Sequence, residues 1–241
     1  KLKEGAKGLK IGILKEGFGH KESEKVVDEH VRNAALKFKE LGAVVEEISI
    51  PEHLLGPIAF MAICCEGGYQ AMLNGNAYGS GYRGLYLPSL MKAQSRWRDM
   101  PDELSKTMKL FSLQGEYLWS QYHGTFYAKG QNLSRRCRQA YDAKLKEYDI
   151  IIMPTLPYRA PEIPKKDCDM DTYIASALGM VANTSIFDLT GHPALNLPIA
   201  KVDGLPIGMM MVSKHFKEAE IYRAAYAWEQ NHDWKKINQE A

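Results

Sequence analysis

The sequence has no apolar run that approaches the roughly 20 residues a membrane-spanning helix needs. Its longest apolar stretches, at residues 150–153 and 209–212, have the length of strands. It also lacks a charge excess, because 31 lysines and arginines face 29 acidic residues. The chain is therefore not expected to bind a membrane or nucleic acid, since it has neither a spanning segment nor a strongly basic surface.

Cysteine is scarce and its spacing is uninformative for metal or redox chemistry. Cys64, Cys65, Cys137 and Cys168 match neither a zinc site nor a Cys-x-x-Cys pair. The neighbours Cys64 and Cys65 cannot form an unstrained disulfide. The histidines are scattered as well. We therefore expect reduced, mostly buried thiols, no metal, no cofactor and a cytoplasmic protein.

The first 51 residues predict a strand–helix–strand unit. A short apolar strand around residues 9–14 is followed by apolar residues at helical spacing, namely Val27, Val31, Ala34, Phe38 and Leu41. Gly42 ends this helix, and residues 44–50 form a second strand. Two strands joined by a helix are expected to be parallel, with a right-handed crossover.

Residues 52–148 predict a mainly helical insertion. Residues 57–73 suit a buried helix, and residues 74–88 read as a glycine- and tyrosine-rich loop. Asp102 is the expected N-cap of a long helix toward Lys129, in which Gly115 and Gly124 are expected weak points. A further helix is expected at residues 135–148.

Residues 149–241 return to strands. The continuous apolar run at residues 149–153 is typical of a central strand covered on both faces. Asp203 and Gly204 stand between two apolar runs, which predicts a hairpin of residues 194–200 and 207–212. Helices are expected at residues 171–183 and 216–230. The predicted fold class is α/β, a mixed β-sheet core flanked by helices.

Three motifs occur in order along the chain. They are GLKIGI with EGFGH at residues 8–20, DIIIMPTLP at residues 149–157, and FDLTGHPA at residues 187–194 with DGLPIG at residues 203–208. In this order and at these spacings they resemble the second half of enzymes of the amidase signature family. The resemblance is greatest to bacterial amidases associated with nitrile degradation, and it covers nearly the whole chain.

The resemblance implies hydrolysis of carboxylic amides to acid and ammonia. A serine attacks the carbonyl carbon, and a lysine acts through a second serine whose peptide bond is cis. In the family these residues surround an upstream Gly-Gly-Ser-Ser-Gly-Gly-like stretch, which this sequence lacks. We therefore expect no catalytic residue in this chain. Residues 1–241 are expected to be the C-terminal portion of a single amidase signature domain, and their polar start fits a chain that begins partway through a longer protein.

The resemblance also implies partners and pocket residues. The expected partners are a small amide substrate, the N-terminal half of the same protein and, in a homodimer, a second copy. An acyl pocket needs an apolar wall, for which Phe60, Ile186 and Phe187 are the candidates. Thr155 is a fourth candidate, because it follows a predicted parallel strand and ligands bind at the carboxyl ends of such strands.

A polar loop precedes the hairpin. Asn183, Asp188 and Thr190 can orient a catalytic base, but such residues also bond to nearby backbone and fix loops. Gly191 permits a positive φ. We expect these four residues to structure the loop rather than to transfer protons.

Two other functions stay open. A non-catalytic binding protein derived from an amidase predicts a closed fold and a retained pocket. A stand-alone hydrolase predicts a perturbed nucleophile beside a histidine, with Cys65 or Ser80 as the candidate; Ser80 lies in the nearest pattern to the missing stretch, Gly79-Ser80-Gly81.

Overall fold

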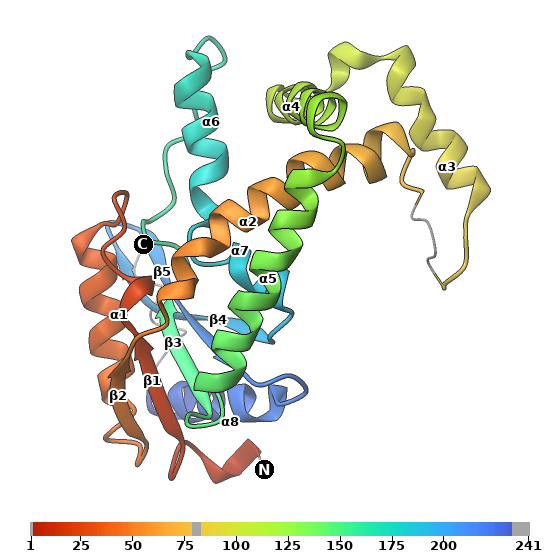
Figure 1. Ribbon diagram of the computed structural model, residues 1–241. Helices are drawn as coiled ribbons and strands as arrows, with labels where there is room; N and C mark the ends of the chain where they lie inside the picture. Colours follow the sequence, from red (N-terminus) through yellow and green to blue (C-terminus); the bar gives the residue numbers. More distant parts are fainter. Residues whose placement is uncertain (1, 79–82, 233–241) are drawn as a thin grey trace. The chain divides into compact units, whose positions relative to one another are not determined.

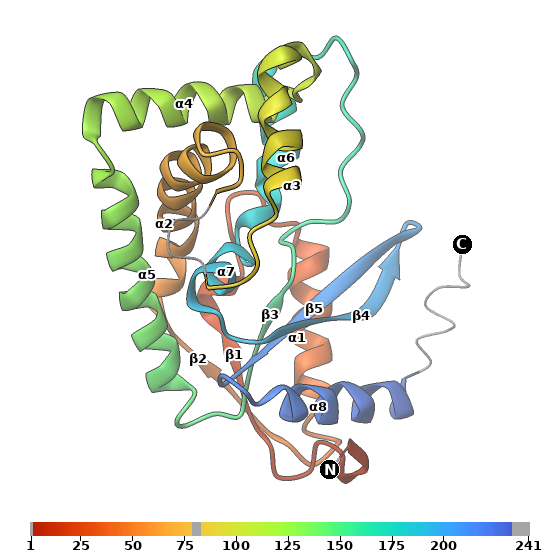
Figure 2. The same cartoon turned by 90° about the vertical axis from the view of Figure 1, so that its right-hand side faces the viewer.

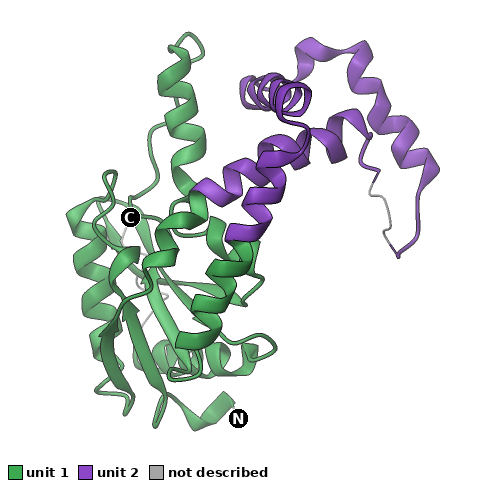
Figure 3. Ribbon diagram, viewed as in Figure 1, with its two compact units in different colours: residues 1–57, 134–241 green, residues 58–133 purple. Residues whose placement is uncertain are grey.

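The computed structural model describes residues 2–78 and 83–232 (Figure 1). The chain forms two compact units (Figure 3). Unit 1 comprises residues 1–57 and 134–241, and unit 2 comprises residues 58–133. The sequence-based division at residues 51 and 148, and the assignment of the whole chain to one larger domain, stay predictions.

Unit 1 is built on a five-stranded mixed sheet with the order β2-β1-β3-β5-β4. Its strands are β1 (Lys10–Leu14), β2 (Val44–Ile48), β3 (Ile150–Pro154), β4 (Ala194–Val202) and β5 (Leu205–Ser213). β1 is parallel to both β2 and β3, whereas β5 is antiparallel to β3 and β4. The predicted mixed sheet is thus confirmed.

The central strand β3 is covered on both faces. Ile150, Ile151, Ile152 and Met153 have no exposed surface. Ile150, Ile151 and Ile152 each pair with β1 on one side and with β5 on the other, so both edges of β3 are occupied by strands. This burial explains why the strand is continuously apolar instead of alternating.

Helices cover the sheet from two sides. α1 (Lys25–Lys37) contacts β3, β4 and β5, and α8 (Glu218–Asn231) contacts β4 and β5. These two helices meet where Phe38 stacks on Trp228, with ring centroids 5.6 Å apart. Figures 1 and 2 show the C-terminal part of α5 (Thr125–Lys144) on the other side of β1 and β3 from α1. There Tyr141 packs edge-to-face on Phe187 of α7 (Ser185–Thr190), at 5.2 Å.

The β4–β5 hairpin turns at the predicted dipeptide. Asp203 and Gly204 have φ of 51° and 76°, so both lie in the left-handed region that a tight hairpin turn requires. The two strands are longer than expected, and their register shifts between Pro198 and Ala200.

The remaining elements of unit 1 are short. They are the 3-10 turns Leu2–Glu4, Lys15–Gly17, Pro51–Leu55 and Gly179–Val181, and α6 (Met170–Leu178). The start of the chain is held by α8, because Arg223 donates hydrogen bonds to the carbonyl oxygens of Gly5 at 2.5 Å and Lys7 at 2.6 Å.

Unit 2 is helical. α2 (Gly56–Ala62) enters it and continues as a π-helix, Ile63–Asn74. Then follow α3 (Pro88–Ser95), the 3-10 turns Arg96–Asp99 and Pro101–Glu103, α4 (Lys106–Tyr122) and the first part of α5. The change from α- to π-helix is a feature that the sequence analysis missed.

The expected N-cap of α4 was wrong. Asp102 lies in a 3-10 turn, and Leu104 is extended, so the α-helix begins only after Ser105. The Ser105 hydroxyl accepts a hydrogen bond from the Met108 amide at 3.3 Å, as an N-cap should. The helix stops at His123 and Gly124, which have φ of 52° and 83°.

Gly115 and Gly130, which the sequence also marks as weak points of the expected helix, do not break a helix. The helix expected at residues 135–148 is the second half of α5, which runs without interruption through Gly130. Gly115 lies within α4, where a Cβ atom would stand 2.2 Å from Cβ of Tyr69. Glycine at this position therefore allows α4 to pack closely on the π-helix. None of the helices in the part of the chain that the structure describes is long and apolar enough to cross a membrane.

Candidate functional site

The carboxyl ends of the parallel strands β1 and β3 form one edge of the sheet in unit 1. Ile13 of β1 is opposite Ile152 of β3, so the two strands end near each other. The chain continues there as Lys15–Gly17 after β1 and as Thr155 after β3. Ligands commonly bind at this edge of an open α/β sheet.

Asn183 joins the two segments that leave this edge. Its side-chain NH2 group donates to the carbonyl oxygens of Gly17 at 3.0 Å and Pro154 at 2.8 Å. Its Oδ1 atom accepts from His20 Nε2 at 2.8 Å and His53 Nε2 at 3.0 Å. The fully buried amide thus uses both donors and both lone pairs.

This network defines the protonation of His53. Because Nε2 donates to Asn183, the other ring nitrogen accepts from the Tyr141 hydroxyl, at 2.7 Å. Burial lowers the pKa of His53 to about 4, and the pKa of Tyr141 is raised well above its usual value by complete burial. Both side chains are therefore neutral at physiological pH, which suits a structural network better than proton transfer.

Glu16 fixes the segment after β2 at the same edge. Its carboxylate accepts from the Ser49 hydroxyl and from the Ile50 amide, the latter at 2.9 Å. Burial by itself raises the pKa of Glu16, but the bonds from Ser49 and Ile50 outweigh it, and the pKa lies below its usual value.

Thr155 lines a cavity of about 230 Å³. The walls include Tyr158, Asn196, Ile207 and Gly208, from the segment after β3 and from the hairpin. The Thr155 hydroxyl donates to Asn196 Oδ1 at 2.5 Å, and the Thr155 amide to the Gly208 carbonyl at 3.1 Å. The largely apolar lining of the cavity therefore also includes two hydroxyl-bearing residues, Thr155 and Tyr158, and the amide of Asn196.

The apolar candidates lie elsewhere. Ile186 and Phe187 are buried in the core of unit 1. Ile186 packs closely on Gly56, because a Cβ atom added to Gly56 would stand 2.8 Å from Cβ of Ile186. Phe60 is half-buried on α2, in unit 2. Their assignment to an acyl pocket, like that of Thr155, stays a prediction.

The polar residues before the hairpin do not form the expected loop, because Asp188 and Thr190 lie in the short helix α7, which Asn183 and Gly191 flank. Asp188 is exposed, and Thr190 is buried with its hydroxyl 2.9 Å from His192 Nδ1. Gly191 has φ of 72° at the end of α7, the left-handed conformation that glycine favours. These contacts and those of Asn183 support a loop-structuring role, which stays a prediction.

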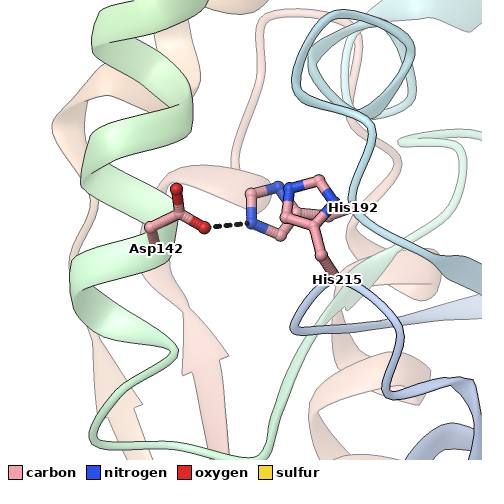
Figure 4. Close-up of side chains that lie close together, drawn as sticks. All are labelled: Asp142, His192 and His215. Carbon is pink, nitrogen blue, oxygen red and sulfur yellow. Dashed lines mark hydrogen bonds and ion pairs between the residues drawn. The ribbon is translucent and has the colours of Figure 1, made fainter.

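The structure brings together a cluster that the sequence analysis did not find. Asp142, His192 and His215 each offer one ligand-type atom within 4.8 Å of the other two (Figure 4). They come from α5, from the segment before β4 and from the segment after β5. The sequence spacing of residues 142, 192 and 215 matches no metal-site motif. The signal that could have indicated the cluster is the predicted hairpin, because its paired ends bring His192 and His215 close together.

Unit 2 holds a larger cavity of about 460 Å³. Its lining includes Glu66, Gln70, Trp119 and Tyr127. The buried carboxylate of Glu66 accepts hydrogen bonds from the amides of Gly124, at 2.8 Å, and Tyr127, at 2.5 Å. Glu66 thereby caps the first turn of α5.

Cys65, one candidate nucleophile of a stand-alone hydrolase, is not activated in the structure. Burial raises the pKa of the Cys65 thiol to about 11, so the thiolate is scarce at neutral pH. Its Sγ atom contacts Gln114 Oε1 at 3.5 Å. Ser80 lies outside the described residues.

Comparison with known proteins identifies related sequences over most of the chain. The family model described as Amidase matches residues 1–222. An uncharacterized protein in the nthA 5′ region of Rhodococcus erythropolis is 46% identical over 168 residues, which are 69% of this chain and 84% of that protein. The enantioselective amidase of Rhodococcus rhodochrous is 40% identical over 90% of this chain, but the match covers only 43% of the amidase.

Solved structures share the fold. A bacterial aryl acylamidase of the amidase signature family matches with a TM-score of 0.73 and 18% identity, over 99% of this chain and 46% of that enzyme. A glutamyl-tRNA(Gln) amidotransferase subunit from Thermotoga maritima matches with a TM-score of 0.65 and 25% identity, over 95% of this chain and 43% of that protein. The chain therefore spans less than half the length of the enantioselective amidase and of these two solved structures.

Proposed function

Since this chain belongs to the amidase family, we propose that it is the C-terminal half of an enzyme that hydrolyses carboxylic amides to acid and ammonia. The observation that carries the proposal is the family match over residues 1–222. The short span relative to the enantioselective amidase supports the idea of a half.

In this proposal the chemistry resides in the N-terminal half of the same protein. That half supplies the serine nucleophile, the second serine with the cis peptide bond and the lysine base. A neutral lysine must be desolvated to accept a proton, so the two halves have to close over the site. The high pKa of Cys65 supports this division, because it leaves the present chain without an activated thiol at that position.

The chain would then contribute support and part of the substrate pocket. The network of Asn183, His20 and His53 holds the sheet edge at which β1 and β3 end. Thr155 would face the acyl group of the substrate, with Ile186 and Phe187 of unit 1 in or behind the apolar wall. Phe60 of unit 2 stays a separate pocket candidate. A homodimer and a cytoplasmic location complete the proposal, the latter supported by four cysteines that form no disulfide.

The test compares the isolated chain with the natural protein. The intact mass of the protein purified from its source is measured, and hydrolysis of benzamide and propionamide is assayed on that sample and on the 27.2 kDa chain. We expect a larger, active natural species and an inactive isolated chain. Hydrolysis by the 27.2 kDa chain alone would overturn the proposal, as would a natural species of that mass without activity.

A second candidate is a non-catalytic binding protein derived from an amidase. The observation that favours it is the 460 Å³ cavity of unit 2, all of whose lining residues lie between residues 66 and 127 of that unit. A natural species of 27.2 kDa without amidase activity would select this candidate. Binding of benzamide, measured by calorimetry and lost on Tyr127→Ala, would then support it.

A further inference from the structure

The cluster of Asp142, His192 and His215 has a donor set that suits a transition metal. Two imidazoles and one carboxylate are ligands that zinc accepts, and three protein ligands plus water complete its coordination. Figure 4 shows His192 between Asp142 on α5 and His215, with its ring directed at the carboxylate.

The spacing of the first two ligands already fits. His192 Nε2 and Asp142 Oδ1 are 3.2 Å apart. Zinc-to-ligand distances near 2.1 Å in a tetrahedral site place neighbouring ligand atoms about 3.4 Å apart. The ligand atom of His215 would have to move slightly toward the other two, because the three atoms lie within 4.8 Å of one another and not within 3.4 Å.

The environment of His192 prepares it as a ligand. Its other ring nitrogen, Nδ1, is 2.9 Å from the Thr190 hydroxyl oxygen, which can accept a hydrogen bond from Nδ1–H and so leave the lone pair of Nε2 for a metal. A second hydrogen bond of this kind orients most metal-binding histidines.

His215 provides an independent indication of a missing ligand. Its Nε2 atom is buried and has no hydrogen-bond partner within the described ranges, 2–78 and 83–232. An unpaired buried nitrogen costs free energy unless something binds it. Its ring lies beside that of His192, with centroids 4.2 Å apart, so a metal that binds His192 is within reach of His215.

One charge opposes metal binding. Arg138 Nε lies 4.0 Å from the second carboxylate oxygen of Asp142. Both side chains are about half exposed, at 53% and 47%, so solvent screens the pair. The metal would use Oδ1 and leave Oδ2 to Arg138.

We infer that Asp142, His192 and His215 form a binding site for a divalent transition-metal ion, with zinc as the preferred occupant. The site joins the end of α5 to the two ends of the hairpin that meet where Ala194 pairs with Val212. A bound ion therefore cross-links three segments of unit 1, and its role is structural. This inference does not depend on the proposed function.

The test uses the full chain, freed of metal and titrated with Zn²⁺ in a calorimeter, with thermal unfolding followed in parallel. We expect one ion per chain and a rise in the unfolding temperature. Asp142→Asn and His215→Gln each weaken binding at least about tenfold, and Thr190→Val weakens it by about tenfold through the orientation of His192. His30→Gln on α1 is the matched control and leaves binding unchanged.

Two results would overturn the inference. One is the absence of a Zn²⁺ binding heat and of a thermal shift in the wild-type chain. The other is equal Zn²⁺ affinity in the wild type and His215→Gln, which would place the ion elsewhere, for example at the cysteine thiols. Because Asp142 and His215 are partly exposed, their variants are expected to fold, and circular dichroism checks this directly.

Discussion

Asn183 Oδ1 accepts a hydrogen bond from His53 Nε2 at 3.0 Å, although the two residues are 130 positions apart in the sequence. The same amide group holds the ends of β1 and β3 through the carbonyl oxygens of Gly17 and Pro154. One side chain therefore links three segments of unit 1, and the predictions that follow begin with it.

Replacing Asn183 should destabilise unit 1 strongly. Asn183→Ala leaves two buried carbonyl oxygens and the ring nitrogen of His53 without a partner, and each such group costs about 1–3 kcal/mol. We expect a loss of roughly 3 kcal/mol or more in urea unfolding. Asn33→Ala, at an exposed position of α1, is the control and should change stability by less than about 0.5 kcal/mol. Similar losses for both variants would contradict the network.

The stability of the chain should fall in mild acid because of His53. The pKa of His53 is about 4 in the folded state, against an ordinary value of 6.5. Between pH 6.5 and about pH 4, this histidine therefore binds a proton in the unfolded chain but not in the folded chain. Stability is therefore lost as the pH falls from about 6.5 to about 4 and levels off below. By pH 5 the loss from this group is about 2 kcal/mol.

The measurement is the free energy of unfolding at pH 7.5 and pH 5 for the wild type and His53→Gln. The wild type should lose more between the two pH values. His192, whose pKa burial also lowers to about 4, affects both proteins alike, so the difference reports His53. Glu16 raises the pKa of His53 and His20 lowers it, so these two neighbours act in opposite directions. An identical pH dependence of both proteins would contradict a neutral, buried His53.

Glu66 should stabilise the start of α5. Glu66→Ala removes the acceptor of the Gly124 and Tyr127 amides, and we expect a loss of about 2 kcal/mol. Glu66→Gln keeps one carbonyl oxygen and should lose about half as much. Amide hydrogen exchange of residues 124–128 should rise in both variants. Glu103→Ala, at an exposed site, is the control. If residues 124–128 also exchange faster in this variant, the effect is a general loss of stability and not the loss of the Glu66 cap.

Two glycines of unit 2 should respond in opposite directions to the same change. Gly115→Ala places a methyl group 2.2 Å from Cβ of Tyr69, and overpacking of this kind costs about 1–3 kcal/mol. Gly68→Ala meets no atom within 4 Å and removes a flexible residue from a helix, so it should stabilise by about 0.5–1 kcal/mol. The measurement is the thermal unfolding temperature of each variant. A rise in this temperature for Gly115→Ala as well as for Gly68→Ala would contradict the close packing of α4 on the π-helix.

The elements that follow local rules were predictable from the sequence. The apolar run of β3 and the Asp203–Gly204 turn each carry their signal within a few residues, and both predictions are confirmed. The cap of α4 was less secure, because Asp102 and Ser105 are both good N-cap residues and only the backbone of Leu104 separates them.

The sites were not predictable by the same reasoning. The Asn183–His20 bond spans 163 positions, and the His192–Asp142 contact spans 50. No periodicity connects such pairs, since their distance depends on how the strands are ordered in the sheet. The π-helix Ile63–Asn74 was not predictable either, because its sequence does not distinguish it from an α-helix.

The order of the strands has a consequence for how the chain acquires its structure during synthesis. β1 pairs with β3, which leaves the ribosome only after all of unit 2. Until then the apolar faces of β1 and α1 have no central strand to cover them, and the exposed strand edge can pair wrongly. The long closure itself adds little free-energy cost, because each doubling of loop length adds about 0.6 kcal/mol. It does delay folding, so β1 and β2 are the strands of unit 1 that wait longest for the central strand β3.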